Sequence, residues 1–119
     1  MIKQIPSNEV EAYIKNNPKS ILLDVRTEEE WSSDGKPDGE KFGLKTYFLT
    51  IKDENFINDF KKLGIQQDQE ILTMCMGGVR SQEAAEILAE ENYNCSNISD
   101  GFLGNSENVG WKNSGLPCK

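Results

Sequence analysis

Two short apolar runs constrain the fold of this chain more strongly than any other feature. They are Ile21–Val25 and Glu70–Met74, and neither alternates regularly between apolar and polar side chains. A strand with one face in water shows that alternation, whereas a strand covered on both faces does not. The two runs therefore predict central strands of a parallel sheet that is covered by helices on each side.

The remaining segments alternate between helical and extended patterns. Helices are predicted from Ser7, as N-cap, to residues 16–18, over Glu28–Trp31, from Asp53, as N-cap, to Gly64, and over Ser81–Asn92. Strands are predicted over Lys45–Ile51 and Cys95–Asp100, a loop over residues 32–43, and a glycine-rich end with a short element around Trp111. This order predicts a single α/β domain over residues 1–119, with three layers and a mainly parallel sheet of about five strands.

The composition excludes several classes of site. The chain has 20 acidic and 13 basic residues, a net charge of -7 and no histidine. Nucleophiles activated by histidine and histidine metal sites are therefore excluded, and an acidic surface disfavours nucleic acid as a partner. No apolar run approaches the length of a membrane span, and the N-terminal segment has no apolar signal core. We expect a cytoplasmic protein with no metal, no cofactor, and no nucleic-acid or membrane partner.

The three cysteines are Cys75, Cys95 and Cys118, and none of them belongs to a CxxC pair. An odd and sparse set favours reduced thiols over a disulfide framework or a zinc site. We expect Cys95 to pack in the interior. Cys118 is expected to be a residue of a loosely held tail, and a resolving thiol for Cys75 is the alternative.

Cys75 is the candidate nucleophile. It follows a predicted buried strand and precedes Met76, Gly77, Gly78, Val79, Arg80 and Ser81, so it is expected at the mouth of the sheet. Two glycines let the backbone curl with its N–H groups inward, while Arg80 and the start of the next helix add positive charge. These features are expected to favour the reactive thiolate without a histidine. The alternative is a buried structural cysteine beside a glycine turn.

Three segments together resemble a known family. The pattern Cys75-x-x-Gly78-x-Arg80-Ser81 resembles the active-site loop of rhodanese-like domains. Residues 23–31, with Asp24-Val25-Arg26 followed by three glutamates and Trp31, resemble the first signature of that family. The segment from Gly101-Phe102 to residues 115–117 is similar to its closing motif. The resemblance covers about residues 20 to 117 and implies the rhodanese-like version of the three-layer fold.

The resemblance implies a sulfurtransferase. Cys75 would take a sulfane sulfur from thiosulfate or a persulfide, hold it as Cys–S–SH, and pass it to cyanide, a thiol or a protein acceptor. The backbone amides from Met76 to Arg80 would bind the sulfur, and Arg80 would shape and charge the loop. Asp24 and Arg26, together with Ser81, would support the loop, and a purely structural ion pair is the alternative role for the first two.

Some residues depart from the family pattern. The usual Gly-His-Ile-Pro-Gly-Ala is replaced by residues 34–43, which contain no histidine, the closing motif is stretched between Gly101 and Trp111, and Asp100 stands in place of a glycine. Met76 offers an apolar side chain after the nucleophile. With a net charge of -7 around the site, we expect modest activity with thiosulfate and better transfer from a neutral or protein-bound persulfide.

Two other functional classes remain open. Cysteine phosphatases and arsenate reductases also hold an anion in a cysteine loop, but their loops have one residue more between cysteine and arginine than the four residues found here. The narrower ring favours a sulfur atom over a phosphate. A thiol-based redox sensor or regulatory binding module is the second alternative, because reactive thiols oxidise selectively.

Overall fold

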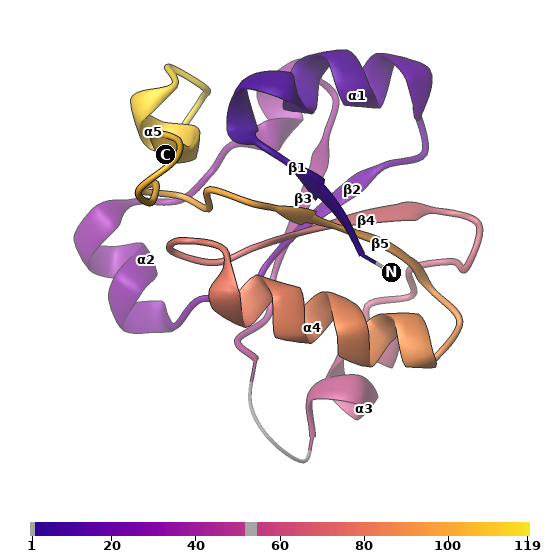
Figure 1. Cartoon of the computed structure of the whole chain (residues 1–119). Coiled ribbons are helices and arrows are strands. Elements are labelled where there is room, and N and C mark those ends of the chain that lie inside the picture. The colour runs from indigo at the N-terminus through magenta and orange to yellow at the C-terminus, as the bar shows by residue number, and fades with distance from the viewer. Residues whose placement is uncertain (1, 52–54) are drawn as a thin grey trace.

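The computed structural model describes residues 2–51 and 55–119 and contains one five-stranded sheet (Figure 1). The strands lie in the order β1-β5-β4-β2-β3, and every neighbouring pair is parallel. Their bounds are Lys3–Ile5 for β1, Ile21–Asp24 for β2, Lys45–Phe48 for β3, Glu70–Met74 for β4 and Asn94–Ile98 for β5. The predicted α/β class and the parallel sheet are confirmed, and β2 and β4 are neighbours at its centre.

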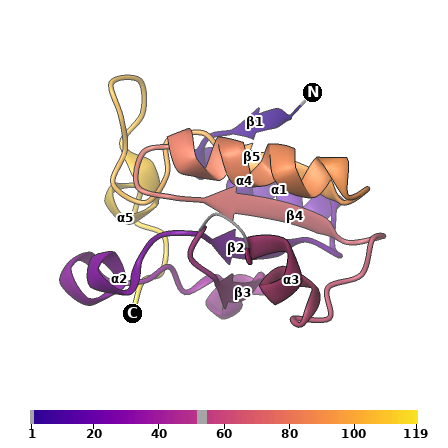
Figure 2. The ribbon, with the colours of Figure 1, turned by 90° about the horizontal axis from the view of Figure 1, so that it is seen from below.

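Helices cover both faces of the sheet, as the uniformly apolar strands require (Figures 1 and 2). The five helices in the described ranges are α1 (Val10–Asn16), α2 (Glu28–Asp34), α3 (Phe56–Lys61), α4 (Val79–Glu90) and α5 (Gly110–Asn113). On one face, Phe56 and Phe60 of α3 and Leu88 of α4 pack against the odd-numbered positions of β2 and β4. On the other face, Val10 of α1 and Trp111 of α5 pack against Leu22 and Leu72.

The end of β4 is fixed beside the end of β2. Asp24 pairs with Met74 in the sheet register, and the Val25 N–H donates to the Met74 carbonyl at 2.8 Å. Residues that follow these two strands therefore emerge side by side at the carboxyl edge. The loop after β4, helix α2 and the segment after β5 gather at this edge (Figure 1).

Several element boundaries differ from the predictions. Ser7 does not cap a helix, because it lies in a 3-10 turn over Ser7–Glu9 and its hydroxyl donates to Asp100. The predicted loop over residues 32–43 contains the last turn of α2 and a second 3-10 turn, Gly39–Phe42. Helix α4 begins at Val79, earlier than the predicted Ser81, because Gly78 is its N-cap. The predicted cap Asp53 lies outside the described residues.

In the described ranges, none of the helices combines the length and the apolar character that crossing a membrane would require.

Candidate active site

Cys75 is the first residue after β4 and lies at the carboxyl edge of the sheet, as predicted, but it is enclosed. Only 1% of its surface is exposed, and it belongs to the core layer formed with α3 and α4. The predicted position is thus found, and the burial agrees with the alternative of a structural cysteine beside a glycine turn. The segment after β5 packs against the loop that contains Cys75, because Phe102 N–H donates to the Cys75 carbonyl and Leu103 N–H to the Met76 carbonyl.

The Cys75 sulfur accepts one backbone hydrogen bond and contacts one hydroxyl. The Gly78 N–H donates to Sγ at 3.1 Å, and Ser81 Oγ lies 3.3 Å from Sγ. Ser81 also hydrogen-bonds to the Oδ1 of Asn97 from β5. The sulfur is thus in a polar niche within an otherwise apolar layer, between the loop backbone and the first turn of α4.

The loop of residues 75–80 is called the Cys75 loop below. Four consecutive carbonyl groups of this loop point outward, towards the end of β5 and the segment that follows it. Each of them accepts a hydrogen bond from the segment that follows or ends β5. The donors to the carbonyls of Cys75, Met76, Gly77 and Gly78 are Phe102 N at 2.8 Å, Leu103 N at 3.1 Å, Asn105 Nδ2 at 3.1 Å and Asn97 Nδ2 at 3.0 Å.

This outward orientation determines where the loop N–H groups point. A trans peptide holds its C=O and the next N–H antiparallel, and the described residues contain no cis peptide bond. The N–H groups of residues 76–79 therefore point away from the partners of the carbonyls. The one that donates to the thiol sulfur is the Gly78 N–H, and the binding of sulfur by the other predicted loop amides stays a prediction.

Gly78 is required by both conformation and space. Its φ of 109° lies in the left-handed region, and a Cβ at this position would overlap the carbonyl of Ser99. Gly101, in the segment after β5, lies equally close to the loop, because an added Cβ at this position would lie 2.5 Å from the Met76 carbonyl. A Cβ on Gly77 would meet only the Gly104 carbonyl, at 3.4 Å. The Cys75 loop and the segment after β5 thus pack backbone against backbone.

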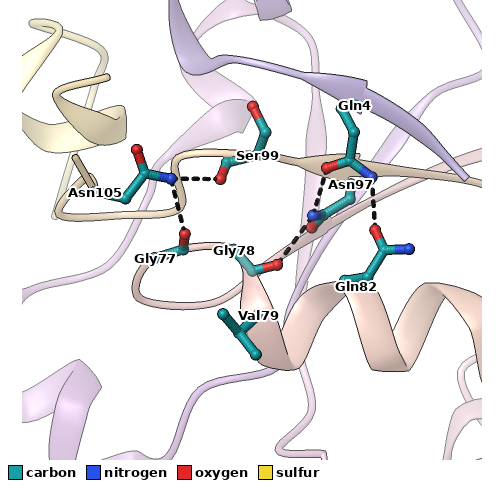
Figure 3. Close-up of a pocket in the computed structure, with 8 residues that line it drawn as sticks. All are labelled: Gln4, Gly77, Gly78, Val79, Gln82, Asn97, Ser99 and Asn105. Atoms are coloured by element: carbon teal, nitrogen blue, oxygen red, sulfur yellow. Dashed lines mark hydrogen bonds between the residues drawn. The ribbon is translucent and has the colours of Figure 1, made fainter. Parts of the chain in front are cut away.

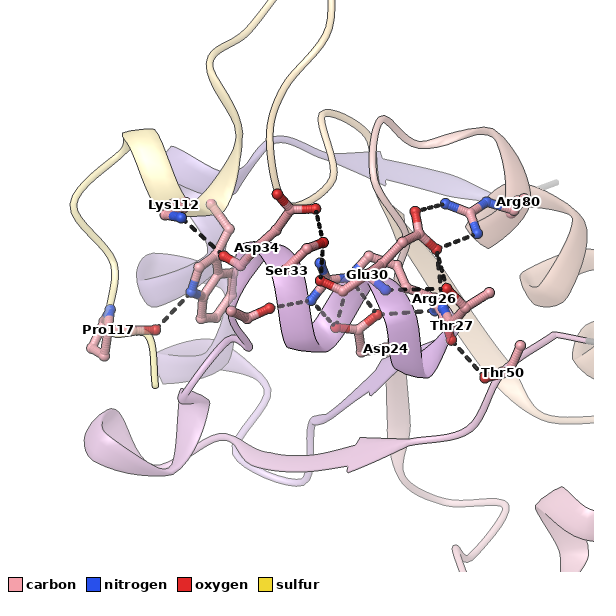
Figure 4. Close-up of polar contacts among 12 residues, drawn as sticks. Asp24, Arg26, Thr27, Glu30, Ser33, Asp34, Thr50, Arg80, Lys112 and Pro117 are labelled. Carbon is pink, nitrogen blue, oxygen red and sulfur yellow. Dashed lines mark hydrogen bonds and ion pairs between the residues drawn. The ribbon is translucent and has the colours of Figure 1, made fainter.

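Arg80 binds a carboxylate rather than the sulfur. Its Nη1 and Nη2 each donate to one oxygen of Glu30 from α2, both at 2.8 Å (Figure 4). This bidentate bond is the main reason that the pKa of Glu30 falls to about 2, and it raises the pKa of Arg80. Arg80 therefore anchors the loop to α2, and much of its charge is balanced there.

Glu30 is also part of a capping box. Thr27 caps α2 by accepting a hydrogen bond from the Glu30 N–H, and the Glu30 carboxylate accepts one from the Thr27 N–H. Sequence reasoning noted the acidic first turn but missed this role. The spacing Thr27-x-x-Glu30 is the signal that would have identified it.

Asp24 and Arg26 form a fully buried ion pair. Arg26 Nη2 donates to Asp24 Oδ2 at 2.8 Å, and both side chains are 0% exposed. Arg26 also donates to the Gly35 carbonyl, and its guanidinium carbon lies 4.2 Å from the ring centre of Phe102. Because the Phe102 N–H holds the Cys75 carbonyl, the pair supports the site indirectly, which agrees with a structural role.

The other predicted loop residues contribute mainly backbone. Met76 is partly buried, whereas the Val79 side chain is 82% exposed at the start of α4. Three residues that touch the loop were missed by sequence reasoning, namely Glu30, Asn97 and Asn105. Asn97 and Asn105 carry no sequence signal, because single asparagines near glycines are ordinary in loops and at strand ends.

The remaining cysteines are unsuited to ionisation. Burial raises the pKa of Cys95 to about 12, and burial is also the main cause that raises the pKa of Cys118. Cys95 packs against the core as predicted. The expectation of a loose tail around Cys118 is wrong, because Lys119 and Lys36 exchange two backbone hydrogen bonds and Cys118 forms a bridge with Pro37.

Comparison with known proteins places these features in a wider group. The model of the rhodanese-like domain matches residues 7–108. The uncharacterized protein RP600 of Rickettsia prowazekii is 37% identical over 120 residues, which cover 98% of this chain and 97% of that protein.

Solved structures show the same fold. The structure of Rv0390 from M. tuberculosis is 28% identical with a TM-score of 0.80, and the match covers 98% of this chain and 96% of that chain. A rhodanese-like domain protein from Staphylococcus aureus is 22% identical with a TM-score of 0.71, covering 99% of both chains. The polysulfide-sulfur transferase homodimer from Wolinella succinogenes is 20% identical with a TM-score of 0.76, covering 99% of this chain and 78% of that one.

Proposed function

The chain belongs to the rhodanese-like domain family, and we propose that it is a sulfurtransferase that carries sulfur as a persulfide on Cys75. The observation that carries this proposal is the Gly78 N–H at 3.1 Å from the Cys75 sulfur, in a loop whose four carbonyls from residues 75 to 78 are all held outward. A site of this kind offers hydrogen-bond donors to a negatively charged sulfur and keeps acceptors away from it.

The transfer consists of two displacements. The Cys75 thiolate attacks the outer sulfur of a donor such as thiosulfate, a new S–S bond forms to Cys75, and sulfite leaves with the electrons of the broken S–S bond. A thiolate or cyanide acceptor then attacks the outer sulfur of the persulfide, and Cys75 leaves as a thiolate. No external oxidant or reductant is needed, because in both steps the leaving group keeps the electron pair of the broken S–S bond and the sulfur is transferred at the sulfane oxidation level.

Ser81 and the loop amides have distinct roles in this scheme. The Gly78 N–H would stabilise the Cys75 thiolate when it forms and when it leaves, and the Ser81 hydroxyl would do so by turning its one proton from Asn97 Oδ1 to the sulfur. The N–H groups of the neighbouring loop peptides would receive the outer sulfur. Since Cys75 is 1% exposed, the donor sulfur reaches it only after neighbouring side chains move aside.

Mass spectrometry of the intact chain tests the proposal. After incubation with a persulfide donor, we expect the wild-type chain to gain one sulfur atom, and the Cys75→Ser variant to gain none. Cys95→Ser and Cys118→Ser serve as matched controls and should load sulfur like the wild type, because their thiols stay protonated. Sulfur that persists in the Cys75→Ser variant would contradict the assignment.

The donor preference and the cellular location extend this proposal. We propose that thiosulfate is a modest donor and that a neutral or protein-bound persulfide is a better one, and that the protein acts in the cytoplasm. The apolar Met76 side chain next to the nucleophile and the net charge of -7 support the donor preference. Comparing second-order loading rates of the two donors checks it, and a faster rate with thiosulfate would contradict it.

The alternatives have weaker support. The four residues between Cys75 and Arg80 leave a narrow ring, and the Arg80 guanidinium is bound to Glu30 instead of facing an oxyanion site. Both observations disfavour a phosphatase or arsenate reductase. A redox sensor would need the same opening of the enclosed Cys75 site, and it lacks the support that the family match and the sulfurtransferase neighbour give to sulfur transfer.

A further inference from the structure

A cavity of about 400 Å³ lies against the outer side of the Cys75 loop (Figure 3). Its walls include four uncharged carboxamide side chains, from Gln4, Gln82, Asn97 and Asn105. Two of these amides bind the loop itself, Asn97 at the Gly78 carbonyl and Asn105 at the Gly77 carbonyl. The side chains of Asn97 and Asn105, which hydrogen-bond to the loop carbonyls, thus line this cavity.

Asn105 uses its whole carboxamide in four hydrogen bonds. Its Nδ2 donates to the carbonyls of Gly77 at 3.1 Å and Ser99 at 2.9 Å (Figure 3). Its Oδ1 accepts from the N–H groups of Glu107 at 2.9 Å and Asn108 at 3.1 Å. Two carbonyls on one side and two N–H groups on the other fix the orientation of the amide.

The bond from Asn105 to Gly77 acts on the peptide that contacts the sulfur. The Gly77 carbonyl and the Gly78 N–H belong to one planar peptide unit, and they point in opposite directions. Asn105 holds the oxygen end at 3.1 Å, and the Cys75 sulfur meets the N–H end at 3.1 Å. Because Gly77 and Gly78 flank this peptide, their backbone freedom would let the peptide rotate. A hydrogen bond from another segment, here from Asn105, is needed to keep it in one orientation.

The stretched closing segment is built around Asn105. Gly104 and Gly110 have φ values of 96° and 88°, and a Cβ on either would overlap the backbone of the other end of the segment. The Asn105 N–H also donates to the Asn108 carbonyl at 2.9 Å. The two ends of the segment, at Gly104 and Gly110, therefore lie against each other. Asn105 follows the first of these ends and contacts the Cys75 loop at Gly77.

We propose that Asn105 is a positioning residue for the sulfur chemistry, which orients the Gly77–Gly78 peptide so that its N–H faces the sulfur of Cys75. This inference rests on the proposed function of Cys75 as the sulfur carrier. It gives the lengthened closing segment a role, because the segment supplies the side chain that maintains a donor towards an anionic sulfur.

Titration of the Cys75 thiolate by its ultraviolet absorbance tests this role. Each protein is measured against the same protein with Cys75→Ser, so that the difference belongs to Cys75. Asn105→Asp keeps the acceptor for Glu107 and Asn108 but replaces the donor to Gly77 with oxygen, and Asn105→Ala removes both without adding charge. Asn113→Asp is the matched control, because it adds the same charge near the segment and removes only a 3.1 Å bond to the Val109 carbonyl.

We expect the thiolate fraction at a fixed pH below the midpoint to fall about tenfold in both Asn105 variants. Without Asn105 the Gly77–Gly78 peptide can turn, and the hydrogen bond from the Gly78 N–H to the charged sulfur is lost. The Asn113→Asp variant should change it less than about twofold. An unchanged titration of Asn105→Ala would overturn the proposal, as would an equal shift in Asn113→Asp. Far-ultraviolet circular dichroism shows whether each variant is folded. If Asn105→Asp does not fold, the titration of Asn105→Ala alone decides the role of Asn105.

The titration requires no sulfur donor, which separates the two proposals. A chain that shows the shift but never gains sulfur contradicts the proposed function alone. A chain that gains sulfur on Cys75 and titrates identically in all variants contradicts the role of Asn105 alone.

Discussion

Glu30 connects two helices through one carboxylate, and its ionisation has a measurable consequence. Its pKa is lowered from 4.5 to about 2, chiefly by the hydrogen bonds from Arg80. A lowered pKa in the folded state means stabilisation that is fully present above 4.5 and is lost as the pH falls towards 2. For Glu30→Gln we expect the free energy of unfolding to drop by about 1 to 2 kcal/mol at neutral pH, allowing for screening at the half-exposed Arg80.

Urea unfolding at several pH values measures this difference. The wild type and Glu30→Gln should converge as the pH approaches 2, while glutamine preserves the capping box. Glu29→Gln, on the exposed side of the same helix, is the matched control and should stay close to the wild type throughout. A constant difference in unfolding free energy between Glu30→Gln and the wild type at every pH would contradict a stabilising role of the Glu30 charge.

The two glycines of the Cys75 loop differ in what they tolerate. Gly78→Ala places a Cβ into the Ser99 carbonyl at a φ of 109°, so we expect it to lower the free energy of unfolding by about 2 to 4 kcal/mol. Gly77→Ala meets only one atom, at 3.4 Å, and should change it by less than about 1 kcal/mol. Thermal unfolding of both variants checks the contrast, and equal losses would show that the loop is not packed as described.

At the scale of elements, Asp100 joins the start of the chain to α5. Its buried carboxylate accepts hydrogen bonds from the Ser7 N–H and hydroxyl at 2.9 Å and from the Gly110 N–H at 3.0 Å. Asp100→Ala would leave these donors buried without a partner, and we expect a loss of about 3 to 5 kcal/mol in unfolding free energy. Ser7→Ala removes one donor and should lose about 1 kcal/mol. Similar losses in the two variants, measured by urea unfolding, would contradict this role.

The predictability of the elements follows from what stabilises each of them. Strands β2 and β4 are covered on both faces, so their apolar runs identify them directly. Strand β1 has three residues, two of them exposed, and only its pairing with β5 makes it a strand. Helix α4 begins at Val79 because Gly78 adopts a left-handed conformation, and an exposed valine gives no sign of such a start.

The site divides in the same way. The Cys75 loop was predictable because its residues are consecutive. Its partners Asn97, Asn105 and Glu30 lie 19, 28 and 50 residues from the groups they hold, so only the folded chain brings them together. The enclosure of Cys75 was not predictable either, because it depends on how closely the loop and the segment after β5 approach each other.

At the scale of the whole molecule, the net charge of -7 acts on any anionic donor. Salt screens such repulsion over a Debye length of about 10 Å at 0.1 M. We expect the rate of sulfur loading from thiosulfate to rise with added sodium chloride, and the rate from an uncharged organic polysulfide to stay nearly constant. Stopped-flow measurement of both rates across a salt series checks this, and a thiosulfate rate that falls with salt would contradict it.

The most direct measurement is a crystal structure of the chain after loading with a persulfide donor. We expect density for one additional sulfur atom bonded to Cys75, with the Gly77 carbonyl still bonded to Asn105 and the loop N–H groups facing the new atom. Additional sulfur on Cys95 or Cys118 instead, or a loop whose carbonyls have turned towards the modified cysteine, would contradict it.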